Sequence, residues 1–295
     1  MIIFRRSGQL GNQIFQIAYA LSIRSQCETI IMNDISQFMS CFEPPIGLRN
    51  IEPCREGARR VTDPFFLSRL AASVGLIYRT AELHSRDGEV VSVIRNRGLI
   101  PITFIEGGWF QDYNVVSQID QSFPRLRSDV RGLARNWIDN LVVGNKRLIF
   151  CHLRRADYLN FHETGINVAL PLSYYLEALG RLAVEDHQTK LLISSDDHEF
   201  VELAFGNTGW PYTIIREDAN TTLAILSMCD AGVISNSSFS WWAGLMVARR
   251  GGRVIAPKNW FGWRDGRCAP PTIETPHFEW LAAPGTEHRA VPPSD

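Results

Sequence analysis

Hydrophobic and polar positions alternate in regular blocks over the second half of the chain. Short apolar runs predict strands at 147–153, 190–195, 212–216, 231–235 and 253–257. The segments between them have apolar residues at helical spacing and predict helices at 172–185, 196–205, 221–229 and 238–249. Strands that alternate with helices on short connections are typical of a doubly wound parallel sheet.

The first half of the chain begins with a similar pattern but becomes irregular. Residues 1–4 and 29–32 predict strands, and residues 13–26 between them predict a helix. The stretch 34–110 offers one clear helical candidate, at 64–77, and helical spacing returns at 129–142.

These two α/β halves predict two domains with parallel sheets and a cleft between them. We expect an N-terminal domain over residues 1–140 and a C-terminal Rossmann-like domain over residues 141–282. The Pro-rich, polar residues 283–295 predict a flexible tail.

Composition restricts the classes of partner and the compartment. The 30 basic and 31 acidic residues give a net charge of −1, which argues against a nucleic-acid partner, so any anion site must be local. The 6 cysteines show no paired spacing and indicate reduced thiols. No signal peptide and no apolar run of about 18 residues is present. We expect a cytoplasmic protein without a transmembrane segment, and peripheral association with the inner membrane stays open.

A cluster of polar residues follows the strand predicted at 147–153. The sequence "FCHLRRADYL" contains His152, Arg154, Arg155 and Asp157. An arginine guanidinium is a planar fork of donors that matches a phosphate. Because side chains alternate along an extended chain, we expect one arginine to face a ligand and the other to pair with a carboxylate. The alternative is a purely structural Arg–Asp pair.

Two adjacent carboxylates, Asp196 and Asp197, follow the next predicted strand in "ISSDDHEF". They are candidates for contacts with a ribose or a guanine edge, or for capping the helix that follows. Their adjacency, and the absence of ligand spacing among the histidines, argues against a metal site. No nucleophile motif indicates covalent catalysis.

Two further segments indicate phosphate contacts. Asn236, Ser237 and Ser238 in "ISNSSFSWW" begin a predicted helix, whose free N–H groups favour a pyrophosphate, although the same residues are also good helix caps. The loop "SGQLGNQ" is a weak phosphate signal, and its glycines allow a ligand to approach Asn12 closely.

Taken together and in order, these segments resemble the bacterial α-1,2-fucosyltransferases of glycosyltransferase family 11. The resemblance extends from near residue 7 to about residue 261 and rests on "GQLGNQIFQIA", "IEGGWFQD", "HLRRADYL", "LPLSYYLEAL", "SSDDHEF", "LSMCDAGVISNSSFSWWAGLM" and "VIAPKNWF". The sequence departs from the family pattern at Ala156, where glycine is common, and at Thr221 and Thr222, where an aspartate is common.

The resemblance implies a GT-B-like fold and an inverting transfer of L-fucose from GDP-fucose to the 2-hydroxyl of a galactoside. It implies no metal and no cofactor beyond the donor substrate. The implied acceptor is a galactose-containing oligosaccharide or lipid-linked glycan, as in O-antigen biosynthesis, and we expect residues 34–110 to select it. The alternatives are a GDP-fucose-dependent transferase of different linkage, a non-catalytic nucleotide- or glycan-binding protein, or a phosphate-ester hydrolase.

The resemblance also implies roles for individual residues. Arg154 would hold the diphosphate, and Asn12 would approach the β-phosphate or the fucose from the other domain. Asp157 is the first candidate for the general base and Glu163 the second. The implied donor-binding residues are His152, Arg155, Asp196, Asp197, Asn236, Ser237 and Ser238.

Overall fold

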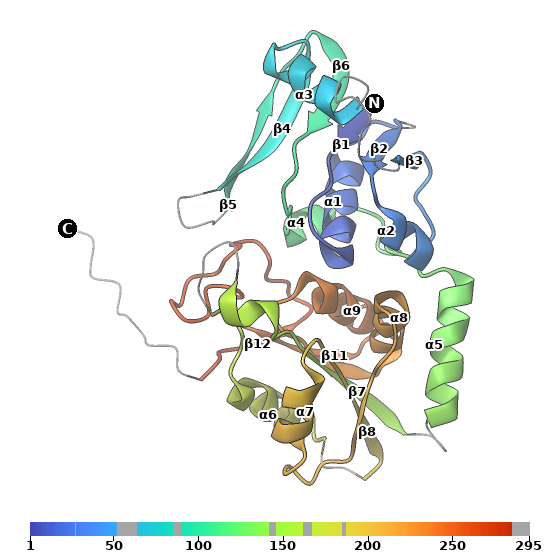
Figure 1. Cartoon of the computed structure of the whole chain (residues 1–295), viewed down its shortest axis with the longest axis vertical. Coiled ribbons are helices and arrows are strands. Elements are labelled where there is room, and N and C mark those ends of the chain that lie inside the picture. Colours follow the sequence, from blue (N-terminus) through green and yellow to red (C-terminus); the bar gives the residue numbers. More distant parts are fainter. Residues whose placement is uncertain are drawn as a thin grey trace, which may run out of the picture. The chain divides into compact units, whose positions relative to one another are not determined.

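The computed structural model describes residues 1–26, 28–51, 64–84, 90–141, 146–161, 167–184 and 187–284. The chain divides into two compact units, Met1–Arg127 and Ser128–Asp295 (Figure 1). Helix α5 (Ser128–Leu141) packs against helix α8 (Ala219–Met228), which places α5 in the second unit. All but two residues of the predicted flexible tail lie outside the described residues.

The first unit contains a six-stranded sheet with the order β3-β2-β1-β6-β4-β5. Its elements are β1 (Ile2–Phe4), α1 (Leu10–Ile23), β2 (Ile30–Asn33), α2 (Ser36–Cys41), β3 (Leu48–Ile51), α3 (Pro64–Ser73), β4 (Ile77–His84), β5 (Val90–Asn96), β6 (Ile100–Ile105) and α4 (Tyr113–Ser117). Neighbouring strands are parallel, except for β4 and β5, which form an antiparallel pair at one edge. Four strands therefore lie in the stretch whose pattern is irregular.

Strand β1 lies at the centre of this sheet and is buried along its whole length. It pairs with β2 on one side and with β6 on the other, with Phe4 opposite both Met32 and Ile105. Because all three strands are parallel, their carboxyl ends meet at one edge. The loop that leads into α1 begins at this edge.

The second unit contains another six-stranded sheet, with the order β12-β11-β10-β7-β8-β9 and every described pair parallel. Its remaining elements are β7 (Arg147–Leu153), the short 3₁₀ helix η2 (Asp157–Asn160), α6 (Leu172–Arg181), β8 (Thr189–Ser195), α7 (His198–Phe205), β9 (Tyr212–Ile214), β10 (Ala231–Val233), α9 (Ser238–Ala248), β11 (Arg253–Pro257) and β12 (Glu279–Leu281). This is the strand order of a dinucleotide-binding fold, in which the order reverses between β7 and β10.

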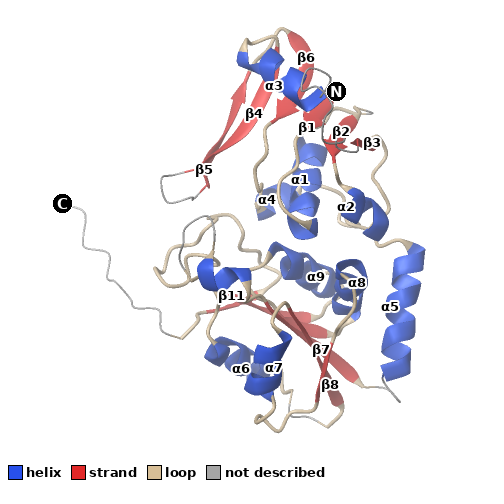
Figure 2. Ribbon diagram, viewed as in Figure 1, coloured by secondary structure: helices blue, strands red, loops and turns tan. Residues whose placement is uncertain are grey.

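Helices cover both faces of the second sheet, with α6 and α7 on one side and α8 and α9 on the other (Figure 2). Alternate side chains of β7 point to opposite faces of the sheet. Ile149, Cys151 and Leu153 pack in the cluster that contains Tyr174 of α6, while His152, one residue out of phase, faces Phe239 of α9. The prediction of two α/β sheets in a GT-B-like chain is confirmed.

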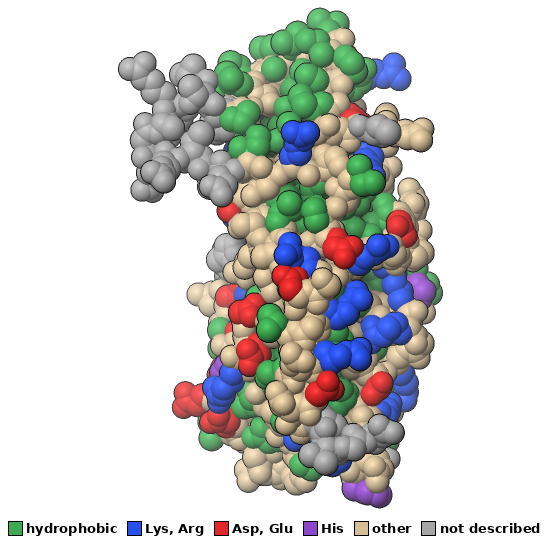
Figure 3. Space-filling model, turned by 90° about the vertical axis from the view of Figure 1, so that its right-hand side faces the viewer, with side chains coloured by type: hydrophobic (Ala, Val, Ile, Leu, Met, Phe, Trp, Pro, Cys, Tyr) green, Lys and Arg blue, Asp and Glu red, His purple; other side chains and the backbone are tan. Residues whose placement is uncertain are grey.

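The two units differ in surface character. On the face seen in Figure 3, basic and acidic side chains are interspersed over the second unit, and hydrophobic side chains gather over the first. Helix α3 of the first unit exposes Phe66, Leu67 and Leu70. In the described part of the chain, every helix falls short of the length and apolar character that crossing a membrane requires.

Candidate functional site

The polar residues predicted from the sequence gather where the strand order of the second sheet reverses, at the carboxyl ends of β7 and β10. His152, near the end of β7, lies 2.9 Å through its Nδ1 atom from the hydroxyl of Ser235, which follows β10. Burial, together with the positive charge of Arg154, lowers the pKa of His152 to about 3. The imidazole is therefore neutral at physiological pH.

Arg154 is held by two carboxylates. Its Nε and Nη2 atoms contact the two oxygens of Asp157, both at 2.9 Å, and Nε lies 3.2 Å from an oxygen of Asp196. Burial lowers the pKa of Arg154, but the hydrogen bond with Asp157 and the charge of Asp196 outweigh that effect and raise it. The side chain is 27% exposed, and its Nη1 has no hydrogen-bond partner among the described residues. Arg154 is thus a fixed cation with a free donor.

Arg155 has a separate set of partners. Its Nε lies 3.1 Å from an oxygen of Asp197, and its guanidinium stacks 3.8 Å from the ring centre of Phe200. Its backbone N–H donates to Asp196 at 2.9 Å. Each of the two adjacent arginines therefore pairs with its own carboxylates, and Asp196 connects them.

The helices that begin at this edge are capped differently. Asp197 caps α7 by accepting from the backbone N–H of Phe200 at 3.0 Å. Asp218 caps α8 by accepting from the N–H groups of Asn220 and Thr221, at 2.8 and 3.2 Å. Ser237 is the N-cap residue of α9 but makes no capping hydrogen bond. The first turn of α9, which starts at Ser238, therefore keeps N–H groups for an external acceptor.

Tyr158 connects the loop after β7 to the residues that precede α9. Its hydroxyl donates to the backbone oxygen of Asn236 at 3.2 Å. Tyr158 follows the arginine cluster in the sequence, on the short helix η2. The loop after β7 and the start of α9 are therefore tied together.

Asn236 is fully buried and incompletely hydrogen-bonded. Its Nδ2 donates to the backbone oxygen of Val168 at 2.9 Å, but its Oδ1 has no partner among the described residues. An unpaired buried acceptor costs about 1–3 kcal/mol. A donor from a ligand or a water molecule would remove this cost.

The two threonines that depart from the family pattern take part in the cap of α8. Thr221 donates through its hydroxyl to Asp218 at 2.6 Å, and Thr222 donates to the backbone oxygen of Glu217 at 3.1 Å. The hydrogen bond from Thr221 lowers the pKa of Asp218.

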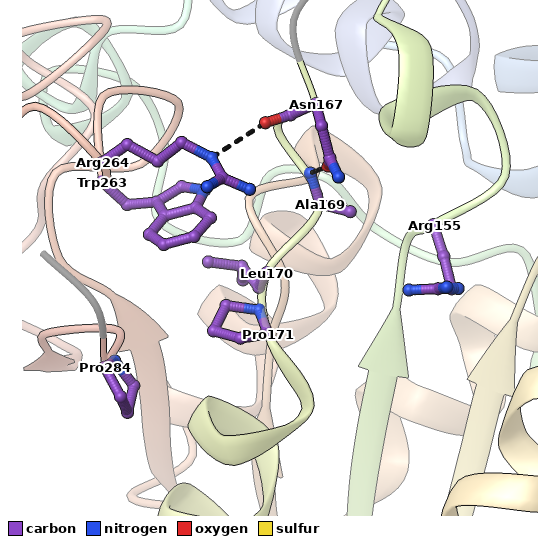
Figure 4. Close-up of a pocket in the computed structure, with 8 residues that line it drawn as sticks. All are labelled: Arg155, Asn167, Ala169, Leu170, Pro171, Trp263, Arg264 and Pro284. Carbon is purple, nitrogen blue, oxygen red and sulfur yellow. Dashed lines mark hydrogen bonds between the residues drawn. The ribbon is translucent and has the colours of Figure 1, made fainter.

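A hollow of about 270 Å³ borders Arg155 in the second unit (Figure 4). Arg264 lies over the ring of Trp263, 4.3 Å from its centre, and donates from Nε to the backbone oxygen of Asn167 at 3.0 Å. The other lining residues are Ala169, Leu170, Pro171 and Pro284. The sequence analysis missed Asn167, Trp263 and Arg264, because they lie in irregular loops without a periodic pattern.

The structure brings together His152, Arg154, Arg155, Asp157, Asp196, Asp197, Asn236, Ser237 and Ser238 in the second unit. Glu163 lies outside the described residues. No group of three or more His, Cys, Asp or Glu side chains in the described ranges is arranged to hold a metal ion.

Asn12 belongs to the first unit, where it lies in the first turn of α1 behind the end of β1. It is 7% exposed, and its Oδ1 accepts from Nε2 of Gln111 at 3.0 Å. Gly8 in the preceding loop has a φ of +73°, and a Cβ atom there would lie 2.3 Å from Nδ2 of Asn12. A residue with a Cβ at position 8 would be strained by the positive φ and would crowd Asn12, so both effects favour glycine there.

Two α/β sheets, with fixed cations and an uncapped helix at the carboxyl edge of the second, are the arrangement of a glycosyltransferase of GT-B-like fold. Residues 103–265, more than half of the chain, match the model of glycosyl transferase family 11. The chain belongs to this family, as the resemblance of its motifs predicted.

Two curated relatives come from Escherichia coli. The O-antigen biosynthesis glycosyltransferase WbnK is 22% identical over 86% of this chain and 93% of its own length. An α-1,2-colitosyltransferase is 27% identical over 37% of this chain and 40% of its own.

Solved structures support the fold. A family 9 glycosyl transferase from Veillonella parvula superposes with a TM-score of 0.53, at 12% identity, over 95% of this chain and 85% of that one. The α-1,6-fucosyltransferase NodZ of Bradyrhizobium, co-crystallised with GDP, superposes with a TM-score of 0.50, at 16% identity, over 88% of this chain and 95% of that one.

Proposed function

We propose that this glycosyltransferase transfers L-fucose from GDP-fucose to the 2-hydroxyl of a galactoside, with inversion, to form an α-1,2 linkage. The observation that carries the proposal is Arg154, a cation held between Asp157 and Asp196 in the same unit as an uncapped helix N-terminus. Both features favour a ligand that develops negative charge.

In the proposed reaction, the bond between C1 of fucose and the β-phosphate oxygen breaks, and its electron pair leaves with GDP. The acceptor O2 forms the new bond to C1 from the opposite face and gives its proton to a base. Arg154 and the N–H groups at the start of α9 stabilise the extra negative charge on GDP. His152, Arg155, Asp196, Asp197 and Asn236 contribute donors and acceptors to the nucleotide.

The general base stays a prediction. Both oxygens of Asp157 are engaged by Arg154, at 2.9 Å each. This geometry favours a role for Asp157 in orienting Arg154. Glu163, the second candidate, lies outside the described residues.

The proposed acceptor is a galactose-containing oligosaccharide or lipid-linked glycan of a surface polysaccharide. Support comes from the E. coli relative named for O-antigen biosynthesis. A different linkage is the second candidate, because NodZ, an α-1,6-fucosyltransferase, has the same fold.

The test is release of GDP from GDP-fucose by the purified protein in EDTA, with a β-galactoside and with its 2-deoxy analogue. We expect release that depends on the acceptor, survives EDTA and disappears with the 2-deoxy sugar. Equal turnover of both acceptors would reject the α-1,2 linkage. Loss of activity in EDTA that Mg²⁺ restores would reject metal independence, and release without any acceptor would indicate a hydrolase.

A further inference from the structure

Two buried amide side chains meet at the carboxyl edge of the first sheet. Asn12 comes from the start of α1, behind β1, and Gln111 follows β6, the strand next to β1. They are 7% and 5% exposed, and Nε2 of Gln111 donates to Oδ1 of Asn12 at 3.0 Å. The sequence analysis assigned no role to Gln111.

Each amide keeps one unused polar atom. Nδ2 of Asn12 and Oε1 of Gln111 have no hydrogen-bond partner among the described residues, and neither atom is sealed from solvent. The pair therefore offers one donor and one acceptor. Rotating both amides exchanges the two roles and again leaves one donor and one acceptor.

The loop that carries Gln111 is fixed by buried and half-buried polar groups. The carboxylate of Glu82 on β4 accepts from the backbone N–H groups of Trp109 and Phe110, both at 2.5 Å. Gln16 on α1 donates to the backbone oxygens of Gly108 and Ser7, at 2.6 and 2.9 Å, and so joins this loop to the loop after β1. The amide pair is thus pre-organised, which lowers the entropic cost of binding a ligand.

Phe110, directly before Gln111, has an unusual backbone conformation. Its φ is +50°, in the left-handed region that residues with a Cβ seldom adopt. Its ring is buried and stacks on Tyr19 with 4.2 Å between the ring centres. Conformations of this kind cluster at ligand sites, where the surrounding structure maintains them.

The chemistry of the pair selects the class of ligand. A phosphate only accepts hydrogen bonds, so an amide oxygen without a hydrogen-bond partner would oppose it. A sugar hydroxyl both donates and accepts, which matches one free N–H group beside one free oxygen. Arg6, a cation on the loop after β1, is engaged by Asp34 and by the backbone oxygen of Gly8.

We propose that Asn12 and Gln111 form a hydroxyl-binding pair for a neutral sugar ring, with Gln111 as a specificity-determining residue. The proposal rests on the proposed function for the identity of the sugar, which is either the acceptor galactoside or the fucose of the donor.

The test compares the wild type with Gln111→Met, which keeps the length of the side chain and removes both polar atoms. Gln118→Met is the matched control, because Gln118 is an exposed glutamine in the same unit. Dissociation constants are measured by NMR titration for a panel of neutral methyl glycosides with GDP present, and by calorimetry for GDP and GDP-fucose. Thermal unfolding checks the fold, and Gln111→Glu serves as a second variant if Gln111→Met unfolds.

We expect about a tenfold weaker affinity for one sugar, with the affinity for GDP unchanged. Weaker galactoside binding identifies the acceptor as the ligand, and weaker binding of GDP-fucose but not of GDP identifies the donor sugar. The proposal is overturned if folded variants bind all ligands as the wild type does, or if GDP and GDP-fucose weaken equally. These binding measurements need no turnover, so failure of galactoside transfer rejects the proposed function separately.

Discussion

The carboxyl edges of both sheets are formed by parallel strands, but they leave different groups for a ligand. In the second unit, Arg154 and Arg155 share the edge with three carboxylates. In the first unit, Arg6 and Asp34 pair with each other at the edge, and two neutral amides, Asn12 and Gln111, lie beside the central strand. Parallel strands provide the edge in both units, and the residues that follow each strand decide which ligand the edge can bind.

The difference shows how two similar sheets in one transferase can bind chemically different parts of its substrates. Fixed charges suit a nucleotide diphosphate, whose charge grows as the sugar leaves. Paired amides suit hydroxyl groups, which need a donor and an acceptor together. Variants at the two edges should therefore affect different steps.

The largest effect is expected for Arg154→Ala. Removing a fixed donor from a leaving group costs about 10²–10³ in rate, or roughly 3–4 kcal/mol. Arg154→Lys keeps the charge but loses the two-pronged contact with Asp157, so we expect an intermediate rate. The measurement is kcat for GDP release at saturating acceptor.

Arg216→Ala is the matched control for that experiment. Arg216 is an exposed arginine in the same unit and pairs with Glu202, so its loss should leave kcat unchanged. If Arg154→Ala folds and keeps kcat within about threefold of the wild type, the charged edge does not stabilise the leaving group.

The second prediction concerns the neutral His152 between Arg154 and Ser235. Its pKa of about 3 in the folded protein lies below the ordinary value of 6.5. Between these values the unfolded chain binds a proton that the folded chain does not, so His152 reduces stability as pH falls. Well below pH 6.5 the loss approaches about 1.4 kcal/mol per pH unit.

His152→Asn removes this proton uptake and keeps a polar partner for Ser235. We expect the variant to be less stable than the wild type at pH 7.5, with a difference that shrinks as the pH is lowered toward 4.5. Urea unfolding at a series of pH values measures this difference. A difference that stays constant across the series would show that His152 does not remain neutral in the folded protein.

The sequence predicted the charged cluster of the second unit better than the amide pair of the first unit, for a physical reason. Arginines and aspartates directly after an apolar strand stand out, because charged side chains are seldom buried without partners. The regular alternation of β7 to β11 with their helices also made the second sheet predictable. The short β12 was missed, since three residues carry too little pattern.

The amide pair gives no comparable signal, although Arg5 and Arg6 also follow an apolar strand directly. Asn12 was singled out by its glycine loop, but Gln111 becomes visible only when β6 is known to lie beside β1. That pairing joins residues about one hundred positions apart and depends on the irregular stretch 34–110, where strands β3 to β6 are short or partly exposed. Likewise, the pairing of Arg154 and Arg155 with Asp196 and Asp197 becomes visible only when β8 is known to lie beside β7.

The smallest effects should separate α8, which a side chain caps, from α9, which is left open. Asp218→Ala removes the side-chain oxygens that accept from Asn220 and Thr221, so we expect a loss of about 1 kcal/mol in the free energy of unfolding. Ser237→Ala removes no capping bond from α9, so its cost should stay below about 0.5 kcal/mol. Urea unfolding measures both changes.

GDP affinity should show the opposite order for the same two variants. The Ser237 hydroxyl lies at the open start of α9, where a phosphate would accept from it, so Ser237→Ala should weaken GDP binding by about three- to tenfold. Asp218→Ala should leave GDP binding unchanged, because the oxygens of Asp218 are occupied by its own helix. If both variants lose stability equally and neither changes GDP affinity, the open start of α9 is a structural feature and the diphosphate depends on Arg154 alone.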